Sequence, residues 1–317
     1  MRDSKDDKVD AALSVLAAPL TLPPAACIVV GLAALRLGRR GKRHIKAEDA
    51  AWRLFTTGPW GELFDRLTWL PWAAMRSPPA CLYVDVSTGR SQVVAHEALA
   101  PPPAGSTRLV VISDTHSKHR LLRLPAGDVL LHCGDVLSRG GYVLRNQGKA
   151  HARGLAALRD FNAWLGQLPH YKAKVVIAGN HDASLEALAP DEQRSLLSHA
   201  VYLQDSAAVV EGLSFYGTPW SSGKSANRAF QAAAPAIPAD LEGTVDVLMS
   251  HCHHDALAVA LQPTLHASGH AHNHHGVVRG PDAAFRGVAI NASTCDGVYR
   301  ARNLPVVVDV TRRRATG

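Results

Sequence analysis

The sequence is short of cysteine and of charged residues. Its 317 residues include 5 cysteines, which lie far apart and form no Cys-x-x-Cys pair, and charged side chains make up only 19% of the chain. An odd, scattered set of cysteines excludes a disulfide framework and predicts a reducing compartment such as the cytoplasm. With 47% apolar residues, the chain is also too hydrophobic for a disordered polyampholyte or a collagen-like fibre.

The N-terminal residues lack the positive charge that begins a signal peptide, because four aspartates stand among the first ten positions. An uncharged run follows at 11–35, and a basic cluster at 36–46 supplies most of the net charge of +7. The run is long enough to span a bilayer, which needs about 20 residues, but three prolines interrupt it. Two readings stay open: residues 11–46 contact a membrane surface and tether a cytoplasmic protein, or the run packs on its own chain.

Composition changes along the chain predict two parts. Residues 52–72 hold four of the 6 tryptophans, residues 81–95 have the pattern of a hairpin, and a Pro-rich linker follows at 101–105. Beyond the linker, short apolar runs alternate with stretches of helical spacing. We therefore expect an N-terminal extension over 1–104 and a catalytic domain over 105–317.

The second part has the pattern of an α/β domain. Helical spacing predicts helices within 150–168 and 184–200, and glycines at 208–220 favour antiparallel strands. Continuous β-branched runs predict strands that are buried on both faces. These runs are 108–113, 128–133, 174–179, 245–250 and 305–310.

Acidic side chains and imidazoles follow the predicted strands. The motifs are Asp-x-His, Gly-Asp, Gly-Asn-His-Asp, a lone His and Gly-His-x-His, each after an apolar run. Because sites in open α/β sheets gather at the carboxyl ends of strands, we expect these motifs to converge. The candidate metal ligands are Asp114, His116, Asp135, Asn180, His251, His270 and His272.

These candidates mix carboxylate and amide oxygens with imidazole nitrogens. Such a donor set suits Mn²⁺, Fe or Zn²⁺ rather than an all-oxygen calcium site. The set is also too large for a single zinc-like ion. If Asp135 bridges, two cations each receive four protein ligands and keep positions for water and substrate. The sequence therefore predicts two divalent metal ions, with Mn²⁺ the first choice and Fe or Zn²⁺ the alternatives.

The ordered motifs resemble those of the calcineurin-like metallophosphoesterase superfamily. The resemblance covers about residues 108–310 and is greatest to the metallophosphoesterase-domain-containing (MPPED-like) group. Further matching segments are Ser113-Asp-Thr-His-Ser117, Phe161-Asn-Ala-Trp-Leu165, Val176-Ile-Ala-Gly-Asn-His181, Tyr216-Gly-Thr-Pro-Trp220 and Asn291-Ala-Ser-Thr-Cys295.

The resemblance implies an α/β fold, a four-layer double β-sandwich flanked by helices, with the site at the sheet ends. It implies that His181 is the acid that protonates the leaving alcohol, that Asp182 orients His181, and that metal-bound hydroxide attacks phosphorus. It also implies how the ligands divide. Asp114, His116, Asp135 and His272 would bind one metal, and Asp135, Asn180, His251 and His270 the other.

Two departures from the pattern of protein serine/threonine phosphatases bear on the substrate. Ser138 stands in place of an aspartate, and Ala178 stands in place of the arginine before the Gly-Asn-His motif. Because arginine binds a phosphate dianion in bidentate fashion, its absence disfavours phosphoprotein phosphatase activity.

The sequence thus predicts a phosphodiesterase of small phosphoesters, including cyclic nucleotides. The alternatives are a phosphomonoesterase with the same metals, or a weakly active nucleotide-binding or scaffold protein. Nucleic acid is not an expected partner, because no stacking aromatics interleave with the basic cluster. The sequence makes no prediction of oligomeric state.

Overall fold

The computed structural model describes residues 78–138, 147–222, 227–231, 241, 245–297 and 299–312. The apolar run at 11–35, the basic cluster at 36–46 and the Trp-rich segment at 52–72 lie outside these residues. Within the described part of the chain, no helix combines the length and apolar character that crossing a membrane requires.

Seven described strands form the first sheet, in the order β2-β1-β13-β3-β4-β5-β6. The run from β3 to β6 is parallel, whereas β13 lies antiparallel to β3. The strands are β1 (Ala80–Val84), β2 (Ser91–Ala95), β3 (Ser106–Ile112), β4 (Val129–Cys133), β5 (Ala173–Ile177), β6 (Val201–Tyr202) and β13 (Val306–Thr311).

Six described strands form the second sheet, in the order β11-β12-β10-β9-β8-β7. Its centre, from β12 through β10 and β9 to β8, is parallel, and β7 and β11 close the edges antiparallel. The strands are β7 (Ser206–Val210), β8 (Leu213–Thr218), β9 (Val247–Ser250), β10 (Leu265–Ser268), β11 (Gly276–Arg279) and β12 (Val288–Asn291).

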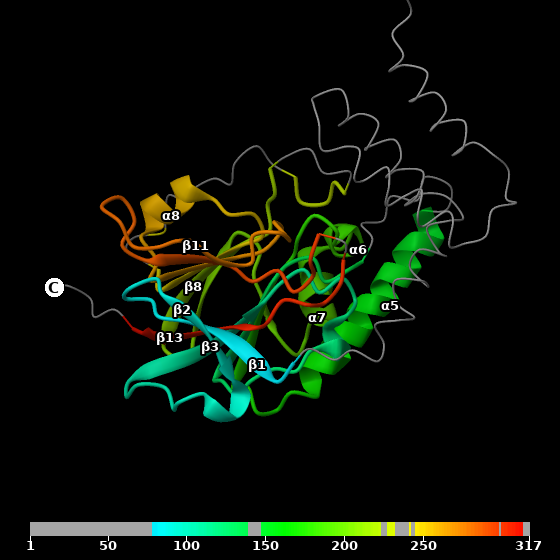
Figure 1. Ribbon diagram of the computed structural model, residues 1–317. Coiled ribbons are helices and arrows are strands. Elements are labelled where there is room, and N and C mark those ends of the chain that lie inside the picture. Colours follow the sequence, from blue (N-terminus) through cyan, green and yellow to red (C-terminus); the bar gives the residue numbers. More distant parts are fainter. Residues whose placement is uncertain are drawn as a thin grey trace, which may run out of the picture. The chain divides into compact units, whose positions relative to one another are not determined.

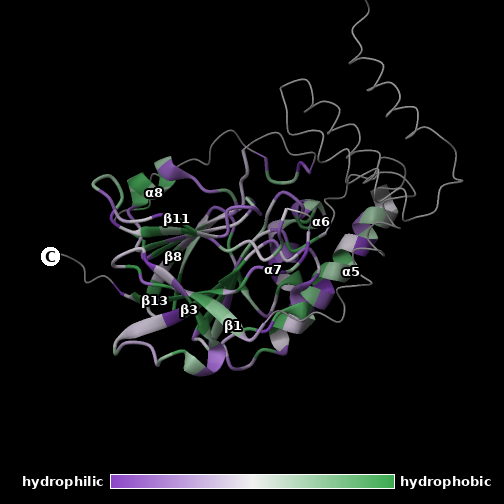
Figure 2. Ribbon diagram, viewed as in Figure 1, coloured by the Kyte–Doolittle hydropathy of each residue, from purple (hydrophilic) through white to green (hydrophobic). Residues whose placement is uncertain are grey.

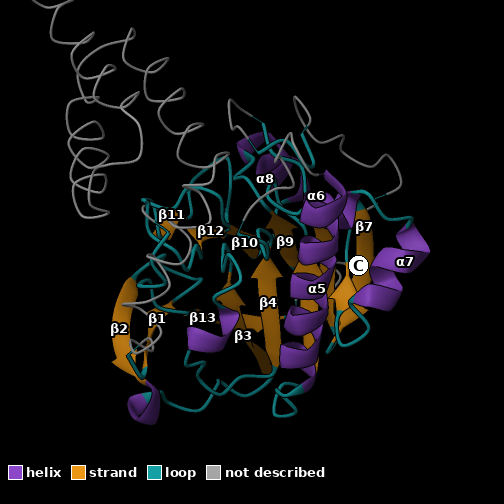
Figure 3. Cartoon of the chain, turned by 90° about the vertical axis from the view of Figure 1, so that its right-hand side faces the viewer, coloured by secondary structure: helices purple, strands orange, loops and turns teal. Residues whose placement is uncertain are grey.

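The two sheets pack face to face, and helices cover their outer faces (Figures 1 and 3). Alternate residues of β3 divide between two cores: Leu109 and Val111 face the other sheet, while Val110 and Ile112 face helix α5 (Gln147–Gly166). Helix α8 (Asp255–Leu261) packs on the outer face of the second sheet. The predicted four-layer fold is therefore confirmed, and the continuous apolar strands in Figure 2 are explained by burial on both faces.

The helix expected within 184–200 is broken into two. Helix α6 (Ala183–Glu186) ends before Ala189, and α7 (Pro190–Leu196) begins with a proline at its first turn. Because proline lacks an N–H and restricts the residue before it, it begins a helix more readily than it continues one. Two short 3-10 helices, η1 (His96–Ala98) and η2 (His119–Leu121), complete the regular elements of the described residues.

The predicted hairpin at 81–95 exists as β1 and β2, but it is part of the first sheet. Strand β1 pairs in parallel with β13, with Leu82 opposite Val306. The predicted boundary between residues 104 and 105 therefore does not separate the hairpin from the catalytic domain. The Pro-rich stretch at 101–105 connects β2 to β3, two strands of the same sheet, and is not a domain linker.

A buried ion pair joins three strands of the first sheet. Arg108 of β3 donates from Nε and Nη2 to the two carboxylate oxygens of Asp309 in β13, both at 2.8 Å. Tyr83 of β1 donates its hydroxyl to the same carboxylate at 3.2 Å. The side chains of Arg108 and Asp309 are only 7% and 4% exposed, so the charges depend on each other for compensation.

We expect Asp309→Ala to lower the free energy of unfolding by about 3–5 kcal/mol, because it leaves the Arg108 guanidinium buried without a counter-charge. Urea denaturation measures the change. The control is Asp191→Ala, which breaks an ion pair of α7 whose carboxylate is 95% exposed and should change stability very little. Equal effects of the two substitutions would contradict the expectation.

Candidate metal centre

The candidate ligands lie in the loops that follow β3, β4, β5, β9 and β10. Four of them, Asp114, His116, Asp135 and His270, have positive φ angles of 50°, 44°, 56° and 65°. Side chains other than glycine rarely adopt this left-handed conformation, and its cost is carried at functional sites where the surrounding fold fixes the backbone. The loops are therefore shaped to present side chains rather than to minimise local backbone energy.

Three glycines make room for these side chains. A Cβ on Gly179 would collide with the carboxylate of Asp135, and a Cβ on Gly269 would collide with that of Asp114. Gly134, with φ +91°, lies against the ring of His251, whose Nδ1 would be 2.7 Å from an added Cβ. The glycines of the Gly-Asp, Gly-Asn-His-Asp and Gly-His-x-His motifs thus allow the loops to approach one another.

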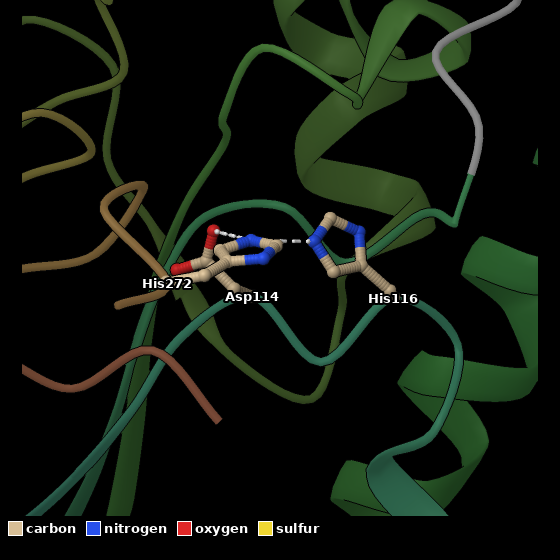
Figure 4. A group of neighbouring side chains, drawn as sticks. All are labelled: Asp114, His116 and His272. Carbon is tan, nitrogen blue, oxygen red and sulfur yellow. Dashed lines mark hydrogen bonds and ion pairs between the residues drawn. The ribbon is translucent and has the colours of Figure 1, made fainter. Parts of the chain in front are cut away.

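The first group of candidate ligands combines Asp114, His116 and His272 (Figure 4). His272 Nε2 lies 3.2 Å from Asp114 Oδ1 and 3.1 Å from His116 Nε2. Two donors bonded to one cation at about 2.1 Å lie about 3.0–3.4 Å apart at octahedral or tetrahedral angles. These spacings fit ligands of a common metal ion.

The second group combines Asn180, His251 and His270. Asn180 Oδ1 lies 3.0 Å from His251 Nε2 and 2.9 Å from His270 Nδ1. The donor atoms again have the spacing of ligands around one ion. The second group therefore brings the lone histidine after β9 together with the motifs after β5 and β10.

Asp135 lies between the groups and directs one oxygen to each. Its Oδ2 is 4.0 Å from His116 Nε2, and its Oδ1 is 3.3 Å from His251 Nε2. Oδ1 also accepts a hydrogen bond from the backbone N–H of His181 at 2.8 Å. The structure thus brings all seven predicted ligands together, with Asp135 in the position that a bridging ligand would occupy.

Backbone carbonyls orient three of the imidazoles. Nδ1 of His116 donates to Leu137 O at 2.8 Å, and Nδ1 of His251 donates to Cys133 O at 2.8 Å. Nδ1 of His272 donates to Asp296 O at 3.1 Å. Because a carbonyl can only accept, Nδ1 carries a proton and Nε2 points to the centre, which is the ring orientation that metal ligation requires.

The electrostatics of the centre favour a positive charge. Burial alone would raise the pKa of Asp114 and Asp135, but neighbouring imidazoles outweigh burial and hold both pKa values below the ordinary range. Burial would likewise lower the pKa of His251, yet the charge of Asp135 raises it well above its ordinary value. Protons and metal ions compete for such a site, because the same donor atoms bind both. The donor set therefore fits divalent cations.

Asp182 does not orient His181 as expected. Its carboxylate accepts hydrogen bonds from the backbone N–H groups of Val136, Leu137 and Gly179, at 3.3, 2.9 and 2.9 Å. Asp182 therefore ties the loop after β4 to the loop after β5. Burial, and next the charge of Asp135, raise the pKa of this carboxyl to about 7.

His181 is held by other groups. Its Nδ1 lies 3.2 Å from Ser138 O, and its Nε2 lies 3.7 Å from Asp135 Oδ2. Two residues absent from the sequence expectations contact the same Nε2: Asn227 Nδ2 at 2.9 Å and the Tyr299 hydroxyl at 3.5 Å. Nothing in the spacing of the sequence links these residues to His181, because they come from distant loops.

Ser293 is a further residue that the sequence patterns missed. Its hydroxyl donates to Asp114 Oδ2 at 2.9 Å, and the backbone N–H of His270 donates to the same oxygen at 2.9 Å. Ser293 lies inside the Asn291–Cys295 segment, whose match to the family pattern was the one sequence signal that could have pointed to it. Its hydroxyl fixes the orientation of a buried carboxylate.

Comparisons with known proteins identify the family of this chain. The pattern of the calcineurin-like phosphoesterase family matches residues 107–274. Metallophosphoesterase domain-containing protein 1 of Homo sapiens is 32% identical over 270 residues, 70% of this chain and 76% of the relative, and the Mus musculus protein gives the same values. A crystal structure of a Thermus thermophilus protein is similar with a TM-score of 0.39 and 10% identity, covering 59% of this chain and 88% of that chain.

The chain therefore belongs to the calcineurin-like phosphoesterase family, whose members are metal-dependent hydrolases of phosphoesters. Within this family its relatives place it in the metallophosphoesterase-domain-containing group. The predicted resemblance to the calcineurin-like superfamily and the predicted resemblance to the MPPED-like group are both confirmed.

We expect Mn²⁺ to raise the melting temperature of the protein, because binding only to the folded state adds about 2.7 kcal/mol of stability at a hundredfold excess over Kd. Asp135→Asn should remove most of this rise, since it weakens both groups of ligands. Differential scanning calorimetry at increasing Mn²⁺ concentrations measures the effect.

The matched control is His274→Ala, which removes an exposed histidine two residues from His272. This variant should respond to Mn²⁺ as the wild type does. An unchanged response in Asp135→Asn would show that Mn²⁺ binds elsewhere.

Proposed function

We propose that the protein is a phosphodiesterase that uses two divalent cations, with Mn²⁺ preferred, to hydrolyse small phosphodiesters such as cyclic nucleotides. The observation that carries this proposal is the pair of donor groups that share Asp135. Oδ2 of Asp135 lies 4.0 Å from His116 Nε2, and Oδ1 of Asp135 lies 3.3 Å from His251 Nε2. Two bound cations supply water activation and neutralisation of phosphate charge.

In this proposal the ligands are divided as the family resemblance implies. Asp114, His116 and His272 hold the first cation, and Asn180, His251 and His270 hold the second, with Asp135 shared. The hydrogen bonds of Asp114 to Ser293 and to the His270 backbone support the division, because they fix this carboxylate toward the first group. No nucleophilic side chain is required.

His181 supplies the proton for the leaving alcohol in this mechanism. Its Nδ1 donates to Ser138 O, and its Nε2 lies 3.7 Å from Asp135 Oδ2, so Nε2 is the nitrogen on the side of the candidate ligands. A positioned imidazole that protonates the departing oxygen accelerates such reactions by about 10²–10⁴-fold. Asn227 Nδ2 lies 2.9 Å from the same Nε2 and donates to it only when that nitrogen carries no proton, so the leaving oxygen would take the place of this contact.

The charge of the site favours diesters over monoesters. A monoester dianion calls for an additional cationic side chain, for which arginine is the best suited. Ala178, which is fully buried, stands where protein phosphatases have that arginine. The described donors around His181 Nε2, Asn227 and Tyr299, are neutral, which suits the single negative charge of a diester.

We expect the Mn²⁺-loaded full-length protein to hydrolyse bis-(para-nitrophenyl) phosphate with a kcat/KM at least about tenfold above that for para-nitrophenyl phosphate, equivalent to about 1.4 kcal/mol of transition-state selectivity. Asp135→Asn serves as the inactive control. Preference for the monoester would favour the phosphomonoesterase alternative. Absence of any rate above this control would leave the nucleotide-binding alternative.

We expect His181→Ala to slow hydrolysis of 2′,3′-cyclic AMP by about 10²–10⁴-fold. The loss with bis-(para-nitrophenyl) phosphate should be much smaller, because nitrophenolate leaves without a proton. Metal analysis should find the wild-type content in this variant, and exposed His170→Ala should match the wild type in both rates. A lower metal content would instead assign His181 to the ligands, as its grouping with His116 and Asp135 permits.

A further inference from the structure

Tyr299 lies in the loop between β12 and β13, and its ring packs against three histidines of the centre. The ring centroids are 4.7 Å from His116, 5.0 Å from His272 and 5.9 Å from His181. These histidines come from the loops after three different strands. Among the described aromatic residues outside the motifs, Tyr299 is the one whose ring packs against three of the site histidines.

The backbone of Tyr299 is strained, with φ at +61°. A bulky aromatic residue adopts this conformation only where its surroundings impose it, and such strain concentrates at functional sites. The loop imposes it here: Tyr299 N donates to Asp296 O at 2.8 Å, and Arg300 donates from Nε to Asp296 Oδ2 at 2.7 Å. Packing alone would be served by an extended residue without this cost.

The same loop orients a predicted metal ligand. The backbone carbonyl of Asp296 accepts a hydrogen bond from the backbone N–H of Tyr299 and another from Nδ1 of His272, the latter at 3.1 Å. The phenol therefore has a fixed position relative to the metal centre and to His181. Its hydroxyl is 3.5 Å from His181 Nε2, the nitrogen on the side of the candidate ligands.

We propose that Tyr299 is a catalytic residue, and that its hydroxyl donates a hydrogen bond to the departing oxygen of the phosphoester, the same oxygen that His181 protonates. The inference rests on the proposed phosphoesterase function. A phenol hydroxyl is a neutral hydrogen-bond donor. A donor fixed in advance stabilises charge that develops in the transition state without reorganisation.

The test compares Tyr299→Phe with the wild type. The ring and its packing remain, so melting temperature and metal content should not change. The kcat/KM for 2′,3′-cyclic AMP should fall by about 10–100-fold, mostly in kcat, with a smaller loss for bis-(para-nitrophenyl) phosphate. In the double variant with His181→Ala, the two losses should be less than multiplicative, since both residues act on one departing oxygen. Tyr202→Phe, which removes a hydroxyl bonded to Gln204, is the matched control and should retain wild-type rates.

A binding measurement separates this inference from the proposed function. Orthovanadate should bind to the Mn²⁺-loaded Tyr299→Phe protein about tenfold more weakly than to the wild type, measured by isothermal titration calorimetry. Weaker vanadate binding with a wild type that hydrolyses no phosphodiester would support the contact of Tyr299 and overturn the function. Unchanged vanadate affinity, or unchanged rates in an active enzyme, would overturn the role of Tyr299.

Discussion

Two carboxylates, Asp114 and Asp135, are buried at the ends of neighbouring parallel strands, and the rest of the site compensates their charge. Uncompensated burial of an ion is costly, and the loops after β5, β10 and β12 each contribute a hydrogen-bond donor. The backbone N–H groups of His181 and His270 and the hydroxyl of Ser293 supply hydrogen bonds, and the imidazoles supply positive charge. Glycines let these loops approach, and the two-sheet core fixes the strand ends from which the loops start. A fold that holds two such carboxylates together is prepared to bind cations.

Much of this arrangement could be predicted from the sequence. The β-branched runs indicated strands buried on both faces, and the motifs after them indicated which side chains share the edge of the sheets. The α/β layers follow directly, because parallel strands bring their carboxyl ends to one side. Strands β6, β11 and β12 and helix α8 were not predicted, since they are short and are defined by their neighbours rather than by their own pattern.

The detailed roles within the site could not be read in the same way. Asp182 follows His181 in the sequence, but its carboxylate turns toward the backbone of Val136 and Leu137, because a buried carboxylate goes where N–H donors are available. Asn227 and Tyr299 reach His181 from loops that are 46 and 118 positions away. Such contacts depend on left-handed backbone positions and on packing, neither of which leaves a periodic trace in the sequence. The hairpin was misassigned for a similar reason: its partner β13 is distant along the chain.

The position of β13 also governs the order in which the domain can be completed. It is the last strand that the structure describes, yet it lies between β1 and β3. Val306 of β13 stands opposite Leu82 of β1. During synthesis, β1 and β2 therefore leave the ribosome long before the strand that joins them to the sheet exists. Until then the apolar edge of β3 stays open as well, and open edges pair with other chains. Closure by β13 thus joins β1 and β2 to the sheet and covers the edge of β3.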